Sequence, residues 1–90
     1  MHTFVIEREM SHAGELSAAD LTAISRKSCS VIRAMGSRIE WLHSYVTADR
    51  IYCIYRAADE AAVREHAAAG GFPANRVAQV RCTIDPDTAK

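Results

Sequence analysis

The sequence has no excess of charge of one sign and no long hydrophobic run. Its 90 residues carry eleven Lys and Arg against eleven Asp and Glu, so the formal net charge is zero. Proteins that bind nucleic acid through broad phosphate neutralisation need a basic face, and this class is therefore not expected. No stretch approaches the length of about eighteen apolar residues that a membrane-spanning helix requires, so no membrane contact is expected.

The three cysteines form no recognisable pattern. Cys29, Cys53 and Cys82 are widely spaced and include no CxxC pair, which argues against a disulfide framework or a structural zinc site. The first residues place acidic groups directly behind a short apolar run and so lack the pattern of a secretory signal. We therefore expect reduced thiols and a cytoplasmic protein.

The remaining composition is that of a small folded domain. Apolar residues make up 49% of the chain and charged residues 24%, and residues 1–90 are predicted to form a single domain. A chain of this size builds only a modest core, and zero net charge leaves little repulsion between copies. These two properties favour a homo-oligomer over a monomer.

Two segments show the periodicity of amphipathic helices. Ser17 and Asp20 form a capping box ahead of a helix predicted over 18–35, and Gly36 stands at its C-terminal end. Asp59 can cap a second helix over about 60–69, which Gly70-Gly71 ends.

Four segments are predicted to be strands, at residues 2–8, 38–46, 51–56 and 76–84. The order of elements is therefore β-α-β-β-α-β. Right-handed crossovers convert this order into an α+β, ferredoxin-like sandwich, with a four-stranded antiparallel sheet and both helices on one face. The expected spatial order of strands is fourth, first, third, second. The second face of the sheet is left bare unless a partner or a small-molecule ligand covers it.

Side-chain alternation sorts the strand residues into two faces. The residues predicted to face the helices are apolar, namely Phe4, Ile6, Leu42, Val46, Ala78, Val80, Cys82 and Ile84. The opposite set mixes aromatic, acidic and basic groups, namely Val5, Glu7, Trp41, His43, Tyr45, Tyr52, Ile54, Arg56, Gln79 and Arg81. An apolar patch with converging polar groups is typical of an interface or a binding site.

His43 is the first candidate metal ligand, because imidazole is the commonest side-chain ligand for transition metals. Glu7, on the same predicted face, could add an oxygen ligand. Their strands flank a third strand and so lie roughly 10 Å apart, and a site shared by two chains across a two-fold axis is an equal alternative. The other interpretation of His43 is a hydrogen-bonded residue in an aromatic dimer interface.

His66 is the second candidate, on the predicted stripe of the second helix with Ala62 and Val63. It is either a histidine beside the core or a second ligand. In the predicted fold His66 and His43 lie on opposite sides of the sheet and cannot share a metal ion within one chain.

Several segments together resemble a known family. These are the strand start VIERE (5–9), the hairpin IEWLHSYV (39–46) with IYCIY (51–55), the helix AAVREHA (61–67) and the segment GFPANRV (71–77). They resemble a family of small bacterial nickel-binding proteins that was long labelled only a domain of unknown function. The similarity extends over about residues 3–87.

The resemblance implies a cytoplasmic, ferredoxin-like homodimer that binds nickel or a similar divalent ion (zinc, cobalt or copper) and acts in metal homeostasis without catalysis. It implies Glu7, His43 and His66 as candidate metal ligands. Tyr45 and Cys53 match the family as well, but packing explains them equally.

Two other functions remain open. One is a small dimeric enzyme, monooxygenase-like or cyclase-like, that acts on an aromatic or polyketide-like molecule in a cleft between Trp41, Tyr45 and Tyr52. His43 would then be the general base, with Arg56 or Arg81 binding an anionic group. The other is a structural interaction module.

Overall fold

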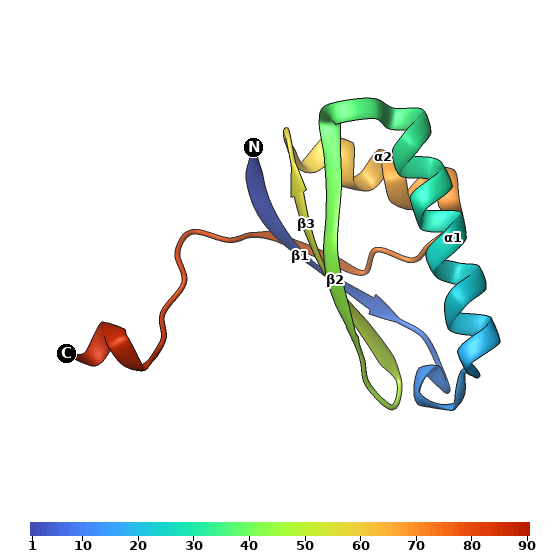
Figure 1. Ribbon diagram of the computed structural model, residues 1–90, viewed down its shortest axis with the longest axis horizontal. Coiled ribbons are helices and arrows are strands. Elements are labelled where there is room, and N and C mark those ends of the chain that lie inside the picture. The colour runs from blue at the N-terminus through green and yellow to red at the C-terminus, as the bar shows by residue number, and fades with distance from the viewer.

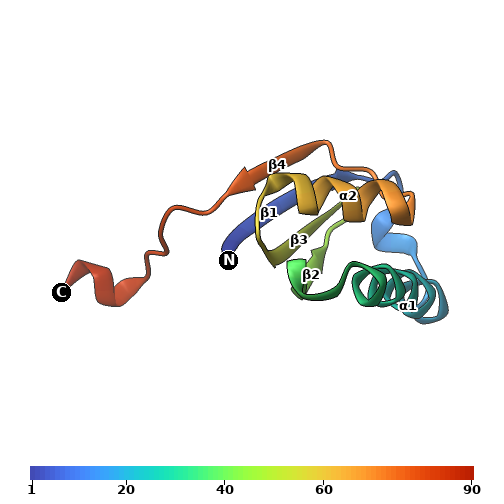
Figure 2. The ribbon, with the colours of Figure 1, turned by 90° about the horizontal axis from the view of Figure 1, so that it is seen from above.

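A computed structural model describes all residues from 1 to 90, and its centre is a four-stranded antiparallel sheet (Figure 1). The strands are β1 (His2–Glu9), β2 (Ile39–Val46), β3 (Arg50–Ala57) and β4 (Arg76–Gln79), arranged in the order β2-β3-β1-β4. Helices α1 (Ala18–Met35) and α2 (Glu60–Gly70) both lie on one face of the sheet (Figure 2). The predicted ferredoxin-like α+β fold and its strand order are confirmed.

The two helices begin and end where local chemistry predicts. The Ser17 hydroxyl accepts a hydrogen bond from the Asp20 amide, and the Asp20 carboxylate accepts one from the Ser17 amide, each at 3.1 Å. This capping box satisfies donors that the first turn of α1 would leave unpaired. Asp59 caps α2 in a similar way. Gly71 ends α2 with a φ of 69°, in the left-handed region that glycine enters without strain.

Short connections complete the chain. Three single-turn 3₁₀ helices are present, η1 (Ala13–Glu15), η2 (Gly36–Arg38) and η3 (Pro86–Ala89). The turn between β2 and β3 is held by Thr47, whose hydroxyl accepts from the Arg50 amide and donates to the Arg50 carbonyl. Neither α1 nor α2 combines the length and hydrophobicity that a transmembrane helix needs.

The core lies between the sheet and the helices. Alternate residues of β1 and β3 supply most of it, because successive side chains of a strand point to opposite faces. The most deeply buried hydrophobic side chains include Phe4, Ile6, Tyr55, Ala57, Val63 and Ala62. We call this side of the sheet the covered face and the other side the open face.

The predicted strand over 76–84 is too long, and its assignment to the two faces is wrong. β4 ends at Gln79, and the register pairs Val77 with Ile6 and Ala78 with Val5. Val77 therefore packs against the core, whereas Ala78 points to the open face. The ladder ends with Gln79 opposite Phe4, and Val80 adds one further backbone hydrogen bond, to the Thr3 carbonyl. The chain beyond it extends away from the sheet, as Figures 1 and 2 show.

Candidate functional site

His43 and Glu7, the two candidate ligands predicted for the open face, lie there in neighbouring rows of side chains that run across the strands. One row runs across three strands from His43 to Ile54 to Val5, and the next runs from Tyr45 to Tyr52 to Glu7. Neither helix covers these rows (Figure 2). Glu7 and His43 therefore share a face, as predicted, with β3 between them.

His43 and Tyr45 form a pair on the edge strand β2. The His43 Nε2 atom lies 3.1 Å from the Tyr45 hydroxyl, and the two rings meet edge to face with centroids 5.1 Å apart. His43 is exposed, and Tyr45 is 59% exposed. An imidazole held in this way has a defined orientation and is open to solvent, both of which suit a metal ligand.

Glu7 already has polar partners within the chain. The Tyr52 hydroxyl donates a hydrogen bond to its carboxylate at 3.3 Å, and Arg50 Nε lies 3.2 Å from the same oxygen. Asp49 is the main cause of a raised pKa at Arg50, with a smaller contribution from Glu7. A metal ion that bound Glu7 would therefore have to share the carboxylate with a guanidinium group.

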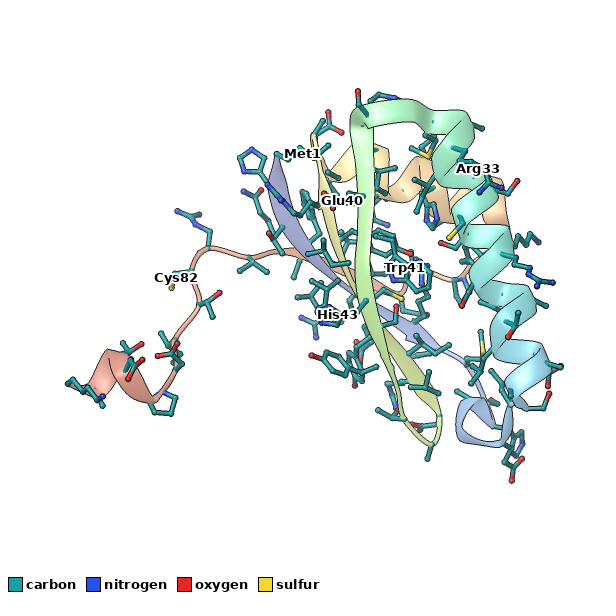
Figure 3. The ribbon with its side chains drawn as sticks, viewed as in Figure 1. Met1, Arg33, Glu40, Trp41, His43 and Cys82 are labelled. Carbon is teal, nitrogen blue, oxygen red and sulfur yellow. The ribbon has the colours of Figure 1, made fainter.

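Trp41 does not belong to this surface, and the prediction that placed it beside His43 and Tyr45 is wrong. The register of β2 shifts between Trp41 and His43, so that Trp41 faces Tyr55 while His43 faces Ile54. A β-bulge inserts one residue and reverses the alternation beyond it. Trp41 accordingly turns toward the helices, and its indole N–H donates to the Ser44 hydroxyl at 2.9 Å (Figure 3).

The bulge corrects two further predictions. Leu42, predicted to face the helices, is the extra residue of the bulge and is exposed. The predicted cleft between Trp41, Tyr45 and Tyr52 does not form, because the first of these residues lies on the other face. None of the cavities in the structure is lined by His43.

His66 lies on the covered face, with no exposed surface. Its Nε2 atom is 3.0 Å from the Ser28 hydroxyl, and its ring stacks on Phe72 with centroids 5.6 Å apart. Burial, together with the positive charge of Arg8, lowers the pKa of His66, and the hydrogen bond with Ser28 opposes this shift. The Nδ1 atom has no hydrogen-bond partner. As predicted, the sheet separates His66 from His43.

The candidate ligands are too few for a complete site within one chain. No group of three or more His, Cys, Asp or Glu residues is arranged to hold a metal ion. The chemistry of the donors is nevertheless suitable, because imidazole nitrogen and carboxylate oxygen together bind nickel, zinc, cobalt or copper.

One buried charged group was not identified from the sequence. Arg8 is only 3% exposed and lies on the covered face, in phase with Phe4 and Ile6. The same alternation that identified those core residues could have revealed it, because a charged residue at a core position is unusual.

The chain was compared with known protein families and solved structures. The fold is similar to the crystal structure of SCO4226 from Streptomyces coelicolor A3(2), with a TM-score of 0.75 and 16% sequence identity, covering 91% of this chain and 99% of that chain. At this identity the likeness concerns the fold alone. No curated protein matches the sequence. A family model described as "Nickel responsive protein SCO4226-like" matches residues 4–80. The resemblance noted in the sequence is thereby confirmed, and the chain belongs to the SCO4226-like family of nickel-responsive proteins.

Proposed function

We propose that this protein binds nickel, or a similar divalent transition metal, on the open face of its sheet, within a homodimer. The proposed role is non-enzymatic binding in metal homeostasis. The family description supports a role related to nickel. The three free cysteines are consistent with a reducing compartment such as the cytoplasm.

The observation that carries the proposal is the position of His43. It is an exposed imidazole, oriented by Tyr45, on the face of the sheet that the helices leave uncovered. A structural histidine needs no such exposure, whereas a ligand must reach its metal ion. Glu7 lies in the adjacent row and supplies an oxygen donor of the kind that divalent metals accept.

A second copy of the chain would complete the site. One chain supplies too few donors, and the open face also carries apolar side chains such as Val5, Ile54 and Tyr45. Pairing two open faces would bury this apolar surface and bring two sets of His43 and Glu7 together across a two-fold axis. Zero net charge leaves little repulsion to oppose the pairing.

The role of His66 as a ligand stays a prediction. Its Nδ1 atom is free of hydrogen bonds, but the side chain is enclosed by Phe72, Tyr55 and Ser28. A metal ion could reach it only if α2 or the segment after it moved.

Calorimetric titration of the metal-free protein with Ni²⁺ tests the proposal, with sedimentation measured in parallel. Wild type is expected to bind, and His43→Ala is expected to weaken binding at least about tenfold, a typical loss when a group that builds a metal site is removed. Glu7→Gln should weaken binding to a smaller extent because Arg50 already engages the carboxylate. His66→Ala decides whether His66 contributes.

The matched control is His12→Ala, which removes an exposed histidine that pairs with Glu15 at 3.2 Å, away from the open face. Equal loss of affinity in His12→Ala and His43→Ala would mean that nickel binds exposed histidines without a site. If Ni²⁺ bound no better to wild type than to the double variant His43→Ala/His66→Ala, the proposed metal site would be excluded. A strictly monomeric nickel complex would contradict the shared site.

A further inference from the structure

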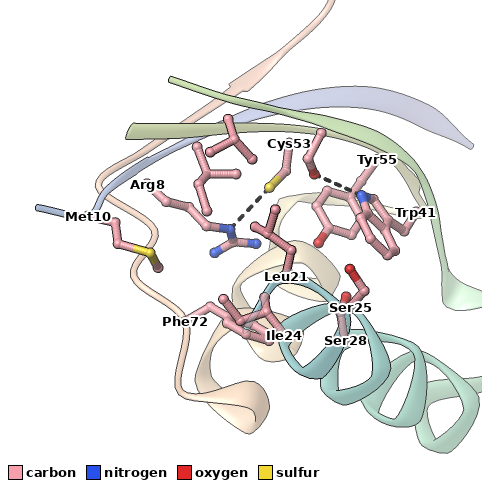
Figure 4. Close-up of a pocket in the computed structure, with 13 residues that line it drawn as sticks. Arg8, Met10, Leu21, Ile24, Ser25, Ser28, Trp41, Cys53, Tyr55 and Phe72 are labelled. Carbon is pink, nitrogen blue, oxygen red and sulfur yellow. Dashed lines mark hydrogen bonds between the residues drawn. The ribbon is translucent and has the colours of Figure 1, made fainter. Parts of the chain in front are cut away.

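We propose that a pocket on the covered face binds a small carboxylate through the buried guanidinium group of Arg8. The pocket lies between α1 and strands β1, β2 and β3, and its lining includes Leu21, Ile24, Trp41 and Phe72 (Figure 4). It is on the opposite side of the sheet from His43. The inference therefore does not depend on the proposed metal site.

Arg8 is a buried cation without a counter-ion. Its side chain takes part in none of the ion pairs of the chain. Its Nε donates to the Cys53 sulfur at 3.4 Å and Nη1 donates to the Pro73 carbonyl, but Nη2 has no partner. A buried charge is costly unless it is paired and fully hydrogen-bonded. No carboxylate of the chain neutralises this charge, and Arg8 forms part of the lining of the pocket.

Neighbouring aromatic rings compensate the charge only in part. The guanidinium carbon lies 5.4 Å from the centre of the Phe72 ring and 6.0 Å from that of Tyr55. Such cation–π contacts are weaker than an ion pair in a desolvated site. Burial raises the pKa of the Tyr55 phenol and outweighs the opposing effect of Arg8 and Ser28, so this group does not act as the counter-anion.

The pocket sets the size and polarity of the ligand. Most of its lining is apolar, with a volume of about 70 Å³. One water needs roughly 10–15 Å³ on this measure, so there is room for a molecule of about five non-hydrogen atoms. A short-chain carboxylate satisfies both the size and the polarity of the pocket, with its carboxylate at Arg8 and its alkyl chain toward Leu21 and Trp41.

The lining of the pocket includes polar groups besides Arg8. Ser25, from α1, lines the same pocket with its hydroxyl group, as Figure 4 shows. Guanidinium groups recognise carboxylates better than a point charge does, because their N–H groups match the carboxylate geometry. An apolar residue of similar volume would fill the space at position 8 without burying a charge, so the presence of Arg8 points to an anionic ligand.

Trp41 makes the proposal directly testable, because it is the only tryptophan of the chain and it lines the pocket. The full chain is titrated with propionate at constant ionic strength, up to about 20 mM since a ligand this small binds no tighter than roughly micromolar. A saturable change in Trp41 fluorescence and a rise in Tm are expected. Propionamide, which has the same shape without charge, should produce neither, and octanoate should be too large.

Arg8→Met should fold, with a Tm no lower than that of wild type, and should bind propionate at least about tenfold more weakly, since it loses the charged partner. The matched control is Arg56→Met, the same substitution at an exposed arginine of the open face, which should leave the response unchanged. Equal responses to propionate, propionamide and chloride in wild type would overturn the proposal, and so would an undiminished response in Arg8→Met. If Arg8→Met does not fold, the comparison of propionate with propionamide decides alone.

Discussion

The two faces of the sheet differ in what they do with ionisable groups, although β1 contributes to both. Glu7 and Arg8 are adjacent in sequence, yet Glu7 points to the open face and Arg8 to the covered face. On the open face, His43 and Glu7 have partners and remain accessible. On the covered face, Arg8 and His66 are enclosed by aromatic rings and each has one nitrogen without a partner.

This difference shows that one strand presents its ionisable groups to two separate environments. Groups on the open face can exchange partners with solvent, a metal ion or a second chain at low cost, because water stabilises them in the unbound state. Groups on the covered face have lost water, so an unpaired nitrogen there carries a large penalty. The covered face consequently holds the stability of the fold, and the open face can change with little effect on it.

The largest expected contrast is between one aromatic side chain on each face. Phe4→Ala should lower the free energy of unfolding by about 3–5 kcal/mol, because Phe4 is 1% exposed and its removal leaves a cavity. Tyr45→Ala should change it by less than about 0.5 kcal/mol in dilute protein. Guanidinium unfolding at two protein concentrations measures both. In a dimer formed through the open face, only the loss at Tyr45 should grow with concentration.

A loss of several kcal/mol for Tyr45→Ala in monomeric protein would contradict this contrast between the faces. A loss below about 1 kcal/mol for Phe4→Ala would do so as well, because it would mean that the covered face closes around the missing ring.

The next effect concerns acid sensitivity of the covered face. The pKa of His66 is lowered in the folded protein, so below about pH 6.5 the unfolded chain takes up a proton that the folded chain does not. Stability is therefore retained above this pH and lost as the pH falls toward the folded pKa, by up to about 1.4 kcal/mol per pH unit. His66→Gln, which is not titratable, should remove this part of the pH dependence.

The pH dependence is measured by thermal unfolding of wild type and His66→Gln between pH 8 and pH 5. The difference between them isolates His66, because carboxylates such as Asp20 and Glu65 titrate alike in each. Parallel curves for wild type and His66→Gln would show that the folded protein protonates His66 as readily as the unfolded chain.

The smallest expected effect is that of an ion pair on the open face. Arg56 and Glu40 lie opposite each other on β3 and β2, 3.9 Å apart, and both side chains are more than half exposed. A double-mutant cycle with Arg56→Ala and Glu40→Ala should give a coupling below about 0.5 kcal/mol that added salt reduces further. A coupling above about 1 kcal/mol that salt did not reduce would contradict the statement that charged groups on the open face exchange partners with solvent at low cost.

Much of the fold could be predicted from local sequence. The capping box at Ser17 and Asp20, the cap at Asp59 and the glycine stops identified both helices to within a residue. Alternation assigned β1 and β3 correctly, with Phe4 and Ile6 buried and Glu7 and Tyr52 on the other side. These features depend on neighbours in sequence, which is why sequence patterns reveal them.

The candidate site could be predicted less completely, because β2 and β4 depend on distant partners. No local pattern signals the bulge after Trp41, which forms where β2 aligns with β3 and moves the indole to the covered face. The faces of β4 are set by its register with β1, some seventy residues away along the chain. A parity rule applied along one strand cannot detect either event.

By itself, the sequence determined the class of fold, the family resemblance and the types of ligand, because helix caps, strand alternation and short motifs are local. Only the tertiary structure decided which contacts the charged and imidazole groups make on each face. It placed His43 on the open face and His66 and Arg8 in the core, where they lie with Ser28, Cys53 and Phe72. Burial and pairing between distant segments set the chemistry of such groups, and these arise only when the sheet and helices pack together.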